Sequence, residues 1–286
     1  MATRPVKIAV ASGKGGTGKT TVAVSLALSA DGPVQFLDCD VEEPNAHIFL
    51  SPEFEERFPV EILVPKLDLD RCIRCGACAK ACRYGALAVI GKRVLFHPEL
   101  CHGCGLCRLV CPAGAISEVP RTIGWVERGH AGQIRFMRGL LEIGEPMATP
   151  IIRRLKRDMS PNLLTVLDAP PGTACPVIET LKGADFALLV TEPTPFGLHD
   201  LRLALRVVQE LGIPAGAVIN RDGIGDDSVE RFLGAEGIPL LLRIPMDRRI
   251  AAAYAEGVPL VEALPKWREE FRALAERIAE AVEARG

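Results

Sequence analysis

The segment VKIAVASGKGGTGKTTVAVSLALS, residues 6–29, decides the fold. Residues 6–11 are short, apolar and partly β-branched, which is typical of a buried parallel strand. Residues 12–20 form a glycine-rich loop, and residues 21–29 are expected to form a helix that ends at Asp31, Gly32 and Pro33. A strand, a glycine loop and a helix in this order predict the first unit of an α/β fold.

The loop Gly13-Lys14-Gly15-Gly16-Thr17-Gly18-Lys19-Thr20 fits the pattern G-x-x-x-x-G-K-[ST] between its strand and its helix. Glycines let the backbone wrap a phosphate, so that successive N–H groups and the helix N-terminus face the anion. Lys19 is expected to reach the β- and γ-phosphates, and the Thr20 hydroxyl is expected to bind Mg²⁺. The alternative is a glycine-rich turn without a ligand, but the complete motif in this context favours a nucleotide site.

The chain on either side of residues 66–118 alternates between strand and helix patterns. Residues 34–37 form an apolar strand that ends at Asp38-Cys39-Asp40, and residues 121–146 are expected to return to the main sheet as a hairpin. Later strands are expected at 163–167, 186–190, 216–219 and 240–244, with helices at about 198–211, 228–236, 248–256 and 266–284. This alternation predicts an α/β fold with a mostly parallel sheet covered by helices on both faces.

Lys14 makes the loop more specific, because K-G-G-x-G-K-T resembles the deviant Walker A loop of the MinD/ParA class of P-loop ATPases. That class includes nitrogenase iron protein and the Mrp-type carriers, and the resemblance covers essentially the whole chain outside residues 66–118. Residues 37–40 resemble its switch I and residues 168–173 its switch II. Residues 219–221 and 244–247 resemble its two adenine-side loops.

The resemblance implies an ATPase with ATP or ADP and Mg²⁺ as ligands, slow and stimulated by a partner. Lys14, Lys19 and Asp40 would be catalytic, with Asp40 orienting the attacking water and Lys14 reaching the partner's phosphates across an ATP-dependent dimer. The alternative for Lys14 is a charge that serves only its own phosphate site. The implied Mg²⁺ residues are Thr20, Asp40 and Asp168. The implied nucleotide-binding residues are Gly13, Lys14, Gly15, Gly16, Thr17, Gly18, Lys19, Thr20, Thr21, Gly172, Asn220, Arg221, Pro245 and Asp247.

Eight of the ten cysteines lie between residues 72 and 111, in two C-x₂-C-x₂-C-x₃-C runs offset by 29 residues. Clustered cysteines in a reducing compartment indicate metal rather than disulfides. The runs resemble the two-cluster bacterial ferredoxin module, in which the fourth cysteine of each run binds the other cluster. The resemblance implies one [4Fe–4S] cluster on Cys72, Cys75, Cys78 and Cys111, and a second on Cys82, Cys101, Cys104 and Cys107. Zinc is the alternative, although it prefers paired C-x₂₋₄-C units.

The expected domain organisation is a discontinuous ATPase domain, residues 1–65 and 119–286, with an inserted ferredoxin domain at 66–118 whose ends lie close together. Residues 66–118 carry eight Lys or Arg and four Asp or Glu. Because each oxidised cluster with its four thiolates carries a net charge of about −2, we expect these cations to offset the clusters.

The whole chain has 286 residues with 34 Lys or Arg and 36 Asp or Glu, a balance that does not suggest a nucleic-acid partner. No signal-peptide pattern and no apolar run of about 18 residues is present, so we expect a cytoplasmic protein without membrane insertion. Five apolar residues at helical spacing near the C-terminus are expected to pack on the sheet rather than on a membrane: Trp267, Phe271, Leu274, Ile278 and Val282.

Two cysteines lie outside the runs. Cys175 follows Asp168 by seven residues. It corresponds to a cysteine of nitrogenase iron protein that binds a cluster shared across the dimer, but a small buried apolar residue at a helix start is the favoured interpretation. Cys39, between the switch I aspartates, is expected to be structural.

The favoured function is an ATP-dependent dimer switch coupled to redox chemistry of two [4Fe–4S] clusters, that is, ATP-gated electron transfer. One alternative is a carrier or assembly ATPase for iron–sulfur clusters or a metallocofactor, and another is a MinD/ParA-like positioning ATPase with redox sensing. The expected partners are a second copy of the chain, or a similar ATPase, and an unidentified redox or metallocofactor protein.

Overall fold

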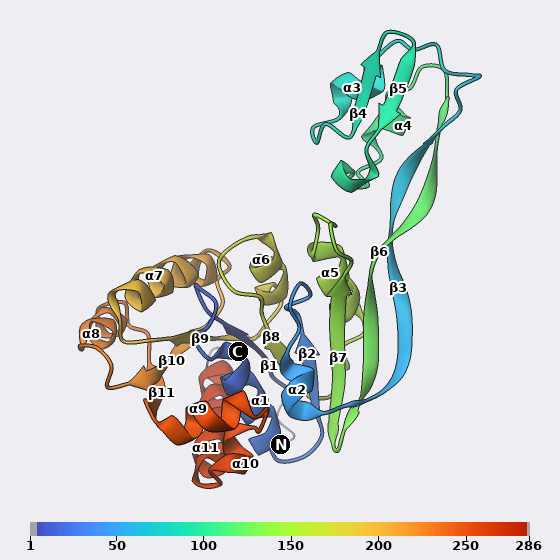
Figure 1. Cartoon of the computed structure of the whole chain (residues 1–286). Helices are drawn as coiled ribbons and strands as arrows, with labels where there is room; N and C mark the ends of the chain where they lie inside the picture. Colours follow the sequence, from blue (N-terminus) through green and yellow to red (C-terminus); the bar gives the residue numbers. More distant parts are fainter. Residues whose placement is uncertain (1–4, 285–286) are drawn as a thin grey trace.

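The computed structural model describes residues 5–284, which form one nine-stranded sheet and a small two-stranded sheet. The strand order of the large sheet is β11-β10-β9-β1-β8-β2-β7-β6-β3 (Figure 1). The pairs from β11 to β7 are parallel, whereas β6 is antiparallel to both β7 and β3. The nine strands are β1 (Lys7–Ala11), β2 (Val34–Asp38), β3 (Glu53–Leu67), β6 (Ile116–Ala131), β7 (Ile134–Leu141), β8 (Leu164–Asp168), β9 (Phe186–Thr191), β10 (Ala215–Asp222) and β11 (Leu240–Pro245).

Helices cover both faces of the sheet, as the sequence predicts, because the strands are apolar on both sides. In β1, Ile8 and Val10 face one core while Ala9 and Ala11 face the other. The Ile8 core includes residues of α1 (Lys19–Ser29), α2 (Ala46–Leu50), α10 (Leu260–Ala263) and α11 (Lys266–Glu283), and α9 (Arg248–Ala255) packs beside α10. The Ala9 core includes residues of α5 (Thr149–Arg157), α6 (Cys175–Leu181), α7 (Pro195–Glu210) and α8 (Ser228–Ala235).

The expected mostly parallel α/β fold is confirmed, and the expected later strands and helices are present within a few residues of their predicted bounds. Residues 121–146 do return to the sheet, through the antiparallel pair β6 and β7. α1 begins at Lys19, two residues inside the expected loop. The apolar stripe of α11 is also confirmed as core, since Trp267, Phe271, Leu274 and Ile278 are buried.

The strands β3 and β6 continue beyond the large sheet as a two-stranded ribbon (Figure 1). At the far end of this ribbon lie α3 (Ala77–Ala81), β4 (Leu87–Ile90), β5 (Arg93–Phe96), the short 3₁₀ helix η1 (Pro98–Leu100) and α4 (Leu106–Leu109). We call residues 66–118 the cysteine module. Leu67 pairs with Ile116, so the two ends of the module are adjacent. The domain division itself stays a proposal, and both ribbon strands run across its boundaries.

None of the helices within residues 5–284 is long and apolar enough to cross a membrane.

Candidate functional site

The glycine loop connects β1 to α1 and contacts the end of β10. Gly18 precedes α1 with φ of 87°, a left-handed conformation that favours glycine. A Cβ atom at Gly18 would lie 2.2 Å from the side-chain nitrogen of Asn220, which donates a 2.8 Å hydrogen bond to the Thr17 carbonyl. Glycine is therefore required at this position both for its backbone angle and for the close approach of Asn220.

Beneath the loop, Lys19 and Thr20 share one carboxylate. Lys19 Nζ lies 2.9 Å from Asp168 Oδ1, and Thr20 Oγ1 donates a 2.7 Å hydrogen bond to Asp168 Oδ2. All three side chains are buried. Burial alone lowers the pKa of Lys19, but the charge and hydrogen bond of Asp168 outweigh it, so the pKa is raised and the ammonium stays charged. The first turn of α1 is thus tied to the end of β8.

Asp38, at the end of β2, holds the segment that follows it. Its carboxylate accepts backbone hydrogen bonds from Asp40 (3.2 Å), Asn45 (3.1 Å) and Ala46 (3.0 Å). Burial, together with the charge of Asp168, raises the pKa of Asp38 to about 8 against the opposing Ala46 hydrogen bond. The sequence analysis gave Asp38 no role of its own, because its three partners become neighbours only when residues 40–46 curl back over the strand end.

Asp40 is half-buried and faces the cavity above the loop. Burial raises the pKa of its carboxyl to about 6, while the Lys19 ammonium lowers it and the charge of Asp168 raises it. A carboxyl with a pKa near neutrality can hold or release a proton under ordinary conditions, which suits a residue that orients a water molecule.

A cavity of about 410 Å³ brings most of the predicted nucleotide residues together. Gly13, Asp168 and Gly172 do not line it: Gly13 packs on the Asp200 backbone, Asp168 lies beneath the loop, and the Gly172 N–H donates a 3.0 Å hydrogen bond to the Ser12 carbonyl. The predicted residues that do line it are Lys14, Gly15, Gly16, Thr17, Gly18, Lys19, Thr20, Thr21, Asp40, Asn220, Arg221, Pro245 and Asp247.

Three further lining residues, Ser12, Pro171 and Met246, lie within segments that the sequence already assigns to this site. The lining also includes residues that were not predicted, namely Glu43, Asn45, Ile250, Ala251 and Tyr254. Asp247, Ile250, Ala251 and Tyr254 are spaced by three or four residues, so one face of α9 lines the cavity. Helical periodicity starting from Asp247 could have identified them. Asp247 itself caps α9, because its side chain accepts a 2.8 Å hydrogen bond from the Arg249 N–H.

Lys14 points to a buried carboxylate of its own chain. Its Nζ lies 3.3 Å from Glu192 Oε2, and Arg221 Nη1 lies 2.5 Å from Glu192 Oε1. Glu192 follows β9 and is nearly inaccessible to solvent, whereas Lys14 is one-third exposed. Nothing in the local sequence signals this contact, because Lys14 and Glu192 lie far apart in the chain.

The eight clustered cysteines line two separate cavities in the cysteine module. One contains Cys72, Cys75, Cys78 and Cys111, and the other contains Cys82, Cys101, Cys104 and Cys107. Each set combines three cysteines of one run with the fourth of the other, the grouping that the ferredoxin resemblance implies. Because the runs fold alike, Gly76 and Gly105 take left-handed angles of 77° and 72° before α3 and α4.

The donor set and the backbone around these cavities fit an iron–sulfur cluster. The Ala115 N–H lies 3.3 Å from Cys111 Sγ, a contact that stabilises a thiolate ligand. Within residues 5–284, no three His, Cys, Asp or Glu side chains converge on one point as a single metal ion requires.

One expectation about the remaining cysteines is wrong. Cys175 does begin α6, but it is exposed rather than buried, because it lies on the solvent side of the helix while Val177 lies on the buried side. Cys39 is fully buried, and burial raises the pKa of its thiol, as expected of a structural cysteine.

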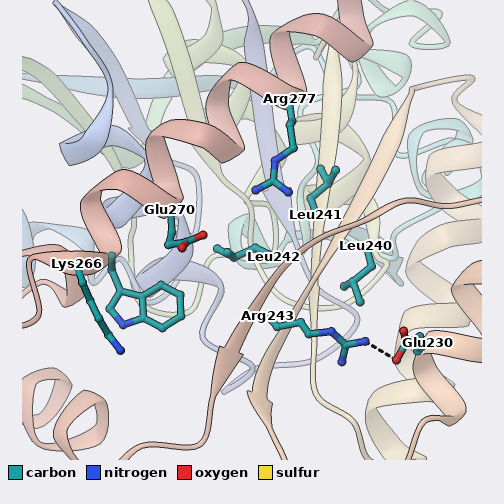
Figure 2. A pocket seen from close by; sticks show the side chains of 9 residues that line it. Glu230, Leu240, Leu241, Leu242, Arg243, Lys266, Glu270 and Arg277 are labelled. Carbon is teal, nitrogen blue, oxygen red and sulfur yellow. Dashed lines mark ion pairs between the residues drawn. The ribbon is translucent and has the colours of Figure 1, made fainter.

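A further cavity of about 570 Å³ lies at the open β11 edge of the sheet, between α8 and α11 (Figure 2). Arg243 forms an ion pair with Glu230 on one side of it, and Lys266, Glu270 and Arg277 line the other. It contains none of the predicted site residues.

Comparison with known proteins places this geometry in a family. Residues 8–260 match the family model described as the CobQ/CobB/MinD/ParA nucleotide binding domain. An uncharacterized protein of Methanocaldococcus jannaschii is 35% identical over 227 residues, which cover 77% of this chain and 80% of that protein. An iron-sulfur cluster carrier protein of Pyrococcus horikoshii is 26% identical, over 86% of this chain and 76% of its own length.

Among solved structures, the cell division ATPase MinD of Pyrococcus furiosus matches with a TM-score of 0.58 at 21% identity, over 98% of this chain and 99% of that one. At that identity the match shows a shared fold. Because the family model spans most of the residues described and its glycine loop is present in full, the chain belongs to the CobQ/CobB/MinD/ParA nucleotide-binding family.

Proposed function

We propose that this chain is an ATPase that dimerises with ATP and couples its nucleotide state to two [4Fe–4S] clusters. One observation carries the proposal: a complete glycine-loop cavity and two four-cysteine cavities belong to one chain and are joined by one continuous ribbon. The presence of both sites in one chain is explained if nucleotide binding at the glycine loop is coupled to the state of the clusters in the cysteine module.

The residues around the loop include the groups that ATP hydrolysis requires. Backbone N–H groups of the loop and the start of α1 would bind the phosphates, and Lys19 would turn from Asp168 toward the β- and γ-phosphates. Thr20, Asp40 and Asp168 would hold Mg²⁺, which neutralises phosphate charge when bound. Asp40 would orient the attacking water, so that ATP and water give ADP and phosphate. Lys14 would act across the dimer on the partner's phosphates.

The residues of the cysteine module would hold the two clusters in the groups that the cavities define. When bound, such clusters supply one-electron transfer. The chain's own part is to exclude water and fix the ligands. Cys101 is buried and Ala115 donates to Cys111, while Cys75 and Cys104 are exposed.

A direct path of hydrogen bonds supports coupling between the two halves. The Leu141 N–H donates a 2.8 Å bond to the Val41 carbonyl, one residue after Asp40. The next residue, Glu142, donates through its N–H to the Ile123 carbonyl of β6, at 3.0 Å. β6 is also one strand of the ribbon that carries the module. A displacement of the Asp40 segment would therefore be transmitted to β6, where the ribbon leaves the large sheet.

A second candidate function is a carrier that delivers clusters to a client protein. The names of the Pyrococcus relatives as iron-sulfur cluster carrier proteins favour it, and so does the exposure of Cys75 and Cys104, since an acceptor must reach ligand atoms. This alternative shares the ATP-dependent dimer but requires labile clusters.

One anaerobic experiment separates the two candidates. Protein with iron bound is mixed with an apo-ferredoxin, with and without ATP, and both proteins are analysed for iron and by electron paramagnetic resonance after dithionite reduction. The proposal expects about eight irons that stay on the chain and two reducible clusters. ATP-dependent loss of iron to the acceptor would support the carrier, and zinc in place of iron would contradict both.

A further inference from the structure

We propose that Glu192 is a positioning residue that holds Lys14 in its own chain and so sets how readily two ATP-loaded chains associate. The inference rests on the proposed function, because it assumes that Lys14 leaves its own chain for the partner's phosphates. Glu192 touches neither nucleotide nor water in this role. It acts only through Lys14.

The contacts show one carboxylate shared by two cations. Glu192 is 6% exposed, and its two oxygens face Lys14 at 3.3 Å and Arg221 at 2.5 Å. Among the described residues, neither cation has another acidic partner. A carboxylate removed from water needs a counter-charge, so at least one of the two cations must remain on it.

The backbone around Glu192 is closely packed, and the second carboxylate oxygen of Glu192 is held by Arg221. A Cβ atom at Gly197 would lie 2.2 Å from the Glu192 carbonyl oxygen, and one at Gly225 would lie 1.4 Å from that of Pro193. The Thr194 hydroxyl accepts a 3.0 Å hydrogen bond from the Gly197 N–H and fixes the start of α7. When Lys14 reaches outward, its contact with Glu192 must therefore break.

Arg221 lowers the energetic cost of breaking the contact between Lys14 and Glu192. It lies in the left-handed region with φ of 54°, a conformation rarely taken by a residue other than glycine, and its guanidinium contacts Glu192. Once Lys14 leaves, Arg221 still neutralises the buried carboxylate. Lys14 can thus bind either of two anions, Glu192 of its own chain or the phosphates of a partner. Because these two contacts compete, Glu192 opposes dimer formation.

The test uses the full chain carrying Glu192→Gln, which keeps the shape and removes the charge. With ADP bound, labelling of Lys14 by an amine-reactive reagent should be faster in this variant, with the exposed Lys92 as an internal reference in the same peptide digest. With a non-hydrolysable ATP analogue, the dimer dissociation constant measured by sedimentation should fall about tenfold. Each dimer releases two lysines, and a partly exposed ion pair contributes up to a few-fold each.

Glu192→Asp provides a second variant if the amide disturbs folding, and its shorter side chain should give intermediate labelling and dimerisation. An unchanged labelling rate together with an unchanged or weaker dimer in both variants would overturn the proposal and make Glu192 a structural residue. Failure of the proposed function looks different: the parent would not dimerise with the analogue, or Lys14→Ala would dimerise as well as the parent.

Discussion

The glycine-loop cavity and the cysteine module hold their polar side chains in opposite ways. Beneath the loop, Lys19, Thr20 and Asp168 are buried and satisfy one another before any phosphate is bound. In the module, only Ala86, Leu87, Cys101, Ala115 and Ile116 of the residues from 66 to 118 are buried, and the eight cysteines line two cavities. The side chains of the first site are held by contacts within the protein, whereas under the proposed function those of the second would be held by the clusters.

The two regions are therefore expected to differ in how much their stability depends on a ligand. The loop belongs to a large sheet with a core on each face, so its geometry should survive without a ligand. A segment as small as the module has too little core to fold alone, and metal binding commonly supplies the missing free energy.

Lys19→Ala should abolish useful nucleotide binding. It removes the charge expected to meet the phosphates and leaves the buried Asp168 without its cation, so ATP affinity should fall about 100-fold or more. Calorimetric titration with ATP measures the loss. The control is Lys92→Ala, which removes an exposed lysine of the module, and equal weakening in both variants would contradict a specific role for Lys19.

Asp40→Asn should slow hydrolysis about 100-fold while ATP affinity stays near that of the parent. A carboxylate that orients water acts in the transition state, so kcat falls and the binding constant does not. Steady-state phosphate release and a separate binding titration give the two quantities. If binding and turnover fall together, Asp40 serves mainly Mg²⁺ binding or the fold and does not orient the attacking water.

The buried Asp38 should make the nucleotide-free protein less stable as the pH rises. Its pKa of about 8 in the folded chain lies well above the usual value of about 3.9, so the folded state keeps a proton that the unfolded chain releases. Stability from this group is complete below pH 4 and is lost as the pH approaches and passes 8. Between pH 6.5 and 8 the free energy of unfolding should fall by about 1–2 kcal/mol.

Urea denaturation at the two pH values measures that fall, and Asp38→Asn should largely remove it. Asp40 has a pKa of about 6 and Lys19 a raised one, so neither titrates strongly in this window. A parent whose stability does not change from pH 6.5 to 8 would show that the Asp38 carboxyl is already ionised in the fold.

Pairs of cysteine variants should show which thiols share a cluster. With the cavities as described, Cys82→Ser with Cys101→Ser damages one site and leaves about four of about eight irons. Cys82→Ser with Cys72→Ser damages both sites and leaves almost none. Iron analysis of anaerobically prepared protein decides, and the reverse pattern would mean that each run holds its own cluster.

The sequence predicted the parts of this molecule that local pattern controls. The glycine loop, the repeated cysteine runs and the later strands each lie within one short segment, where spacing and apolar periodicity determine the outcome. The ribbon was not predicted, because β3 contains Pro59 and Pro65 and reads as a loop. Its position at the sheet edge explains why it tolerates proline.

Contacts between distant segments could not be predicted from the sequence, for a different reason. Asp38 meets residues 45 and 46 only after the chain turns back, and Glu192 meets Lys14 only because β9 lies beside β1 in the sheet. The misjudged exposure of Cys175 has the same origin, since a cysteine at a helix start is buried or exposed according to what packs over it.

The central claim is that nucleotide state and cluster state are coupled, and the reduction potentials of the clusters test it most directly. Redox titration monitored by electron paramagnetic resonance is performed with ADP and with a non-hydrolysable ATP analogue, on the parent and on Lys14→Ala. We expect at least one potential to differ between the two nucleotides by about 60 mV, a tenfold coupling, and this difference to disappear in Lys14→Ala. Identical potentials with both nucleotides in the parent, under conditions where the analogue is bound, would contradict it.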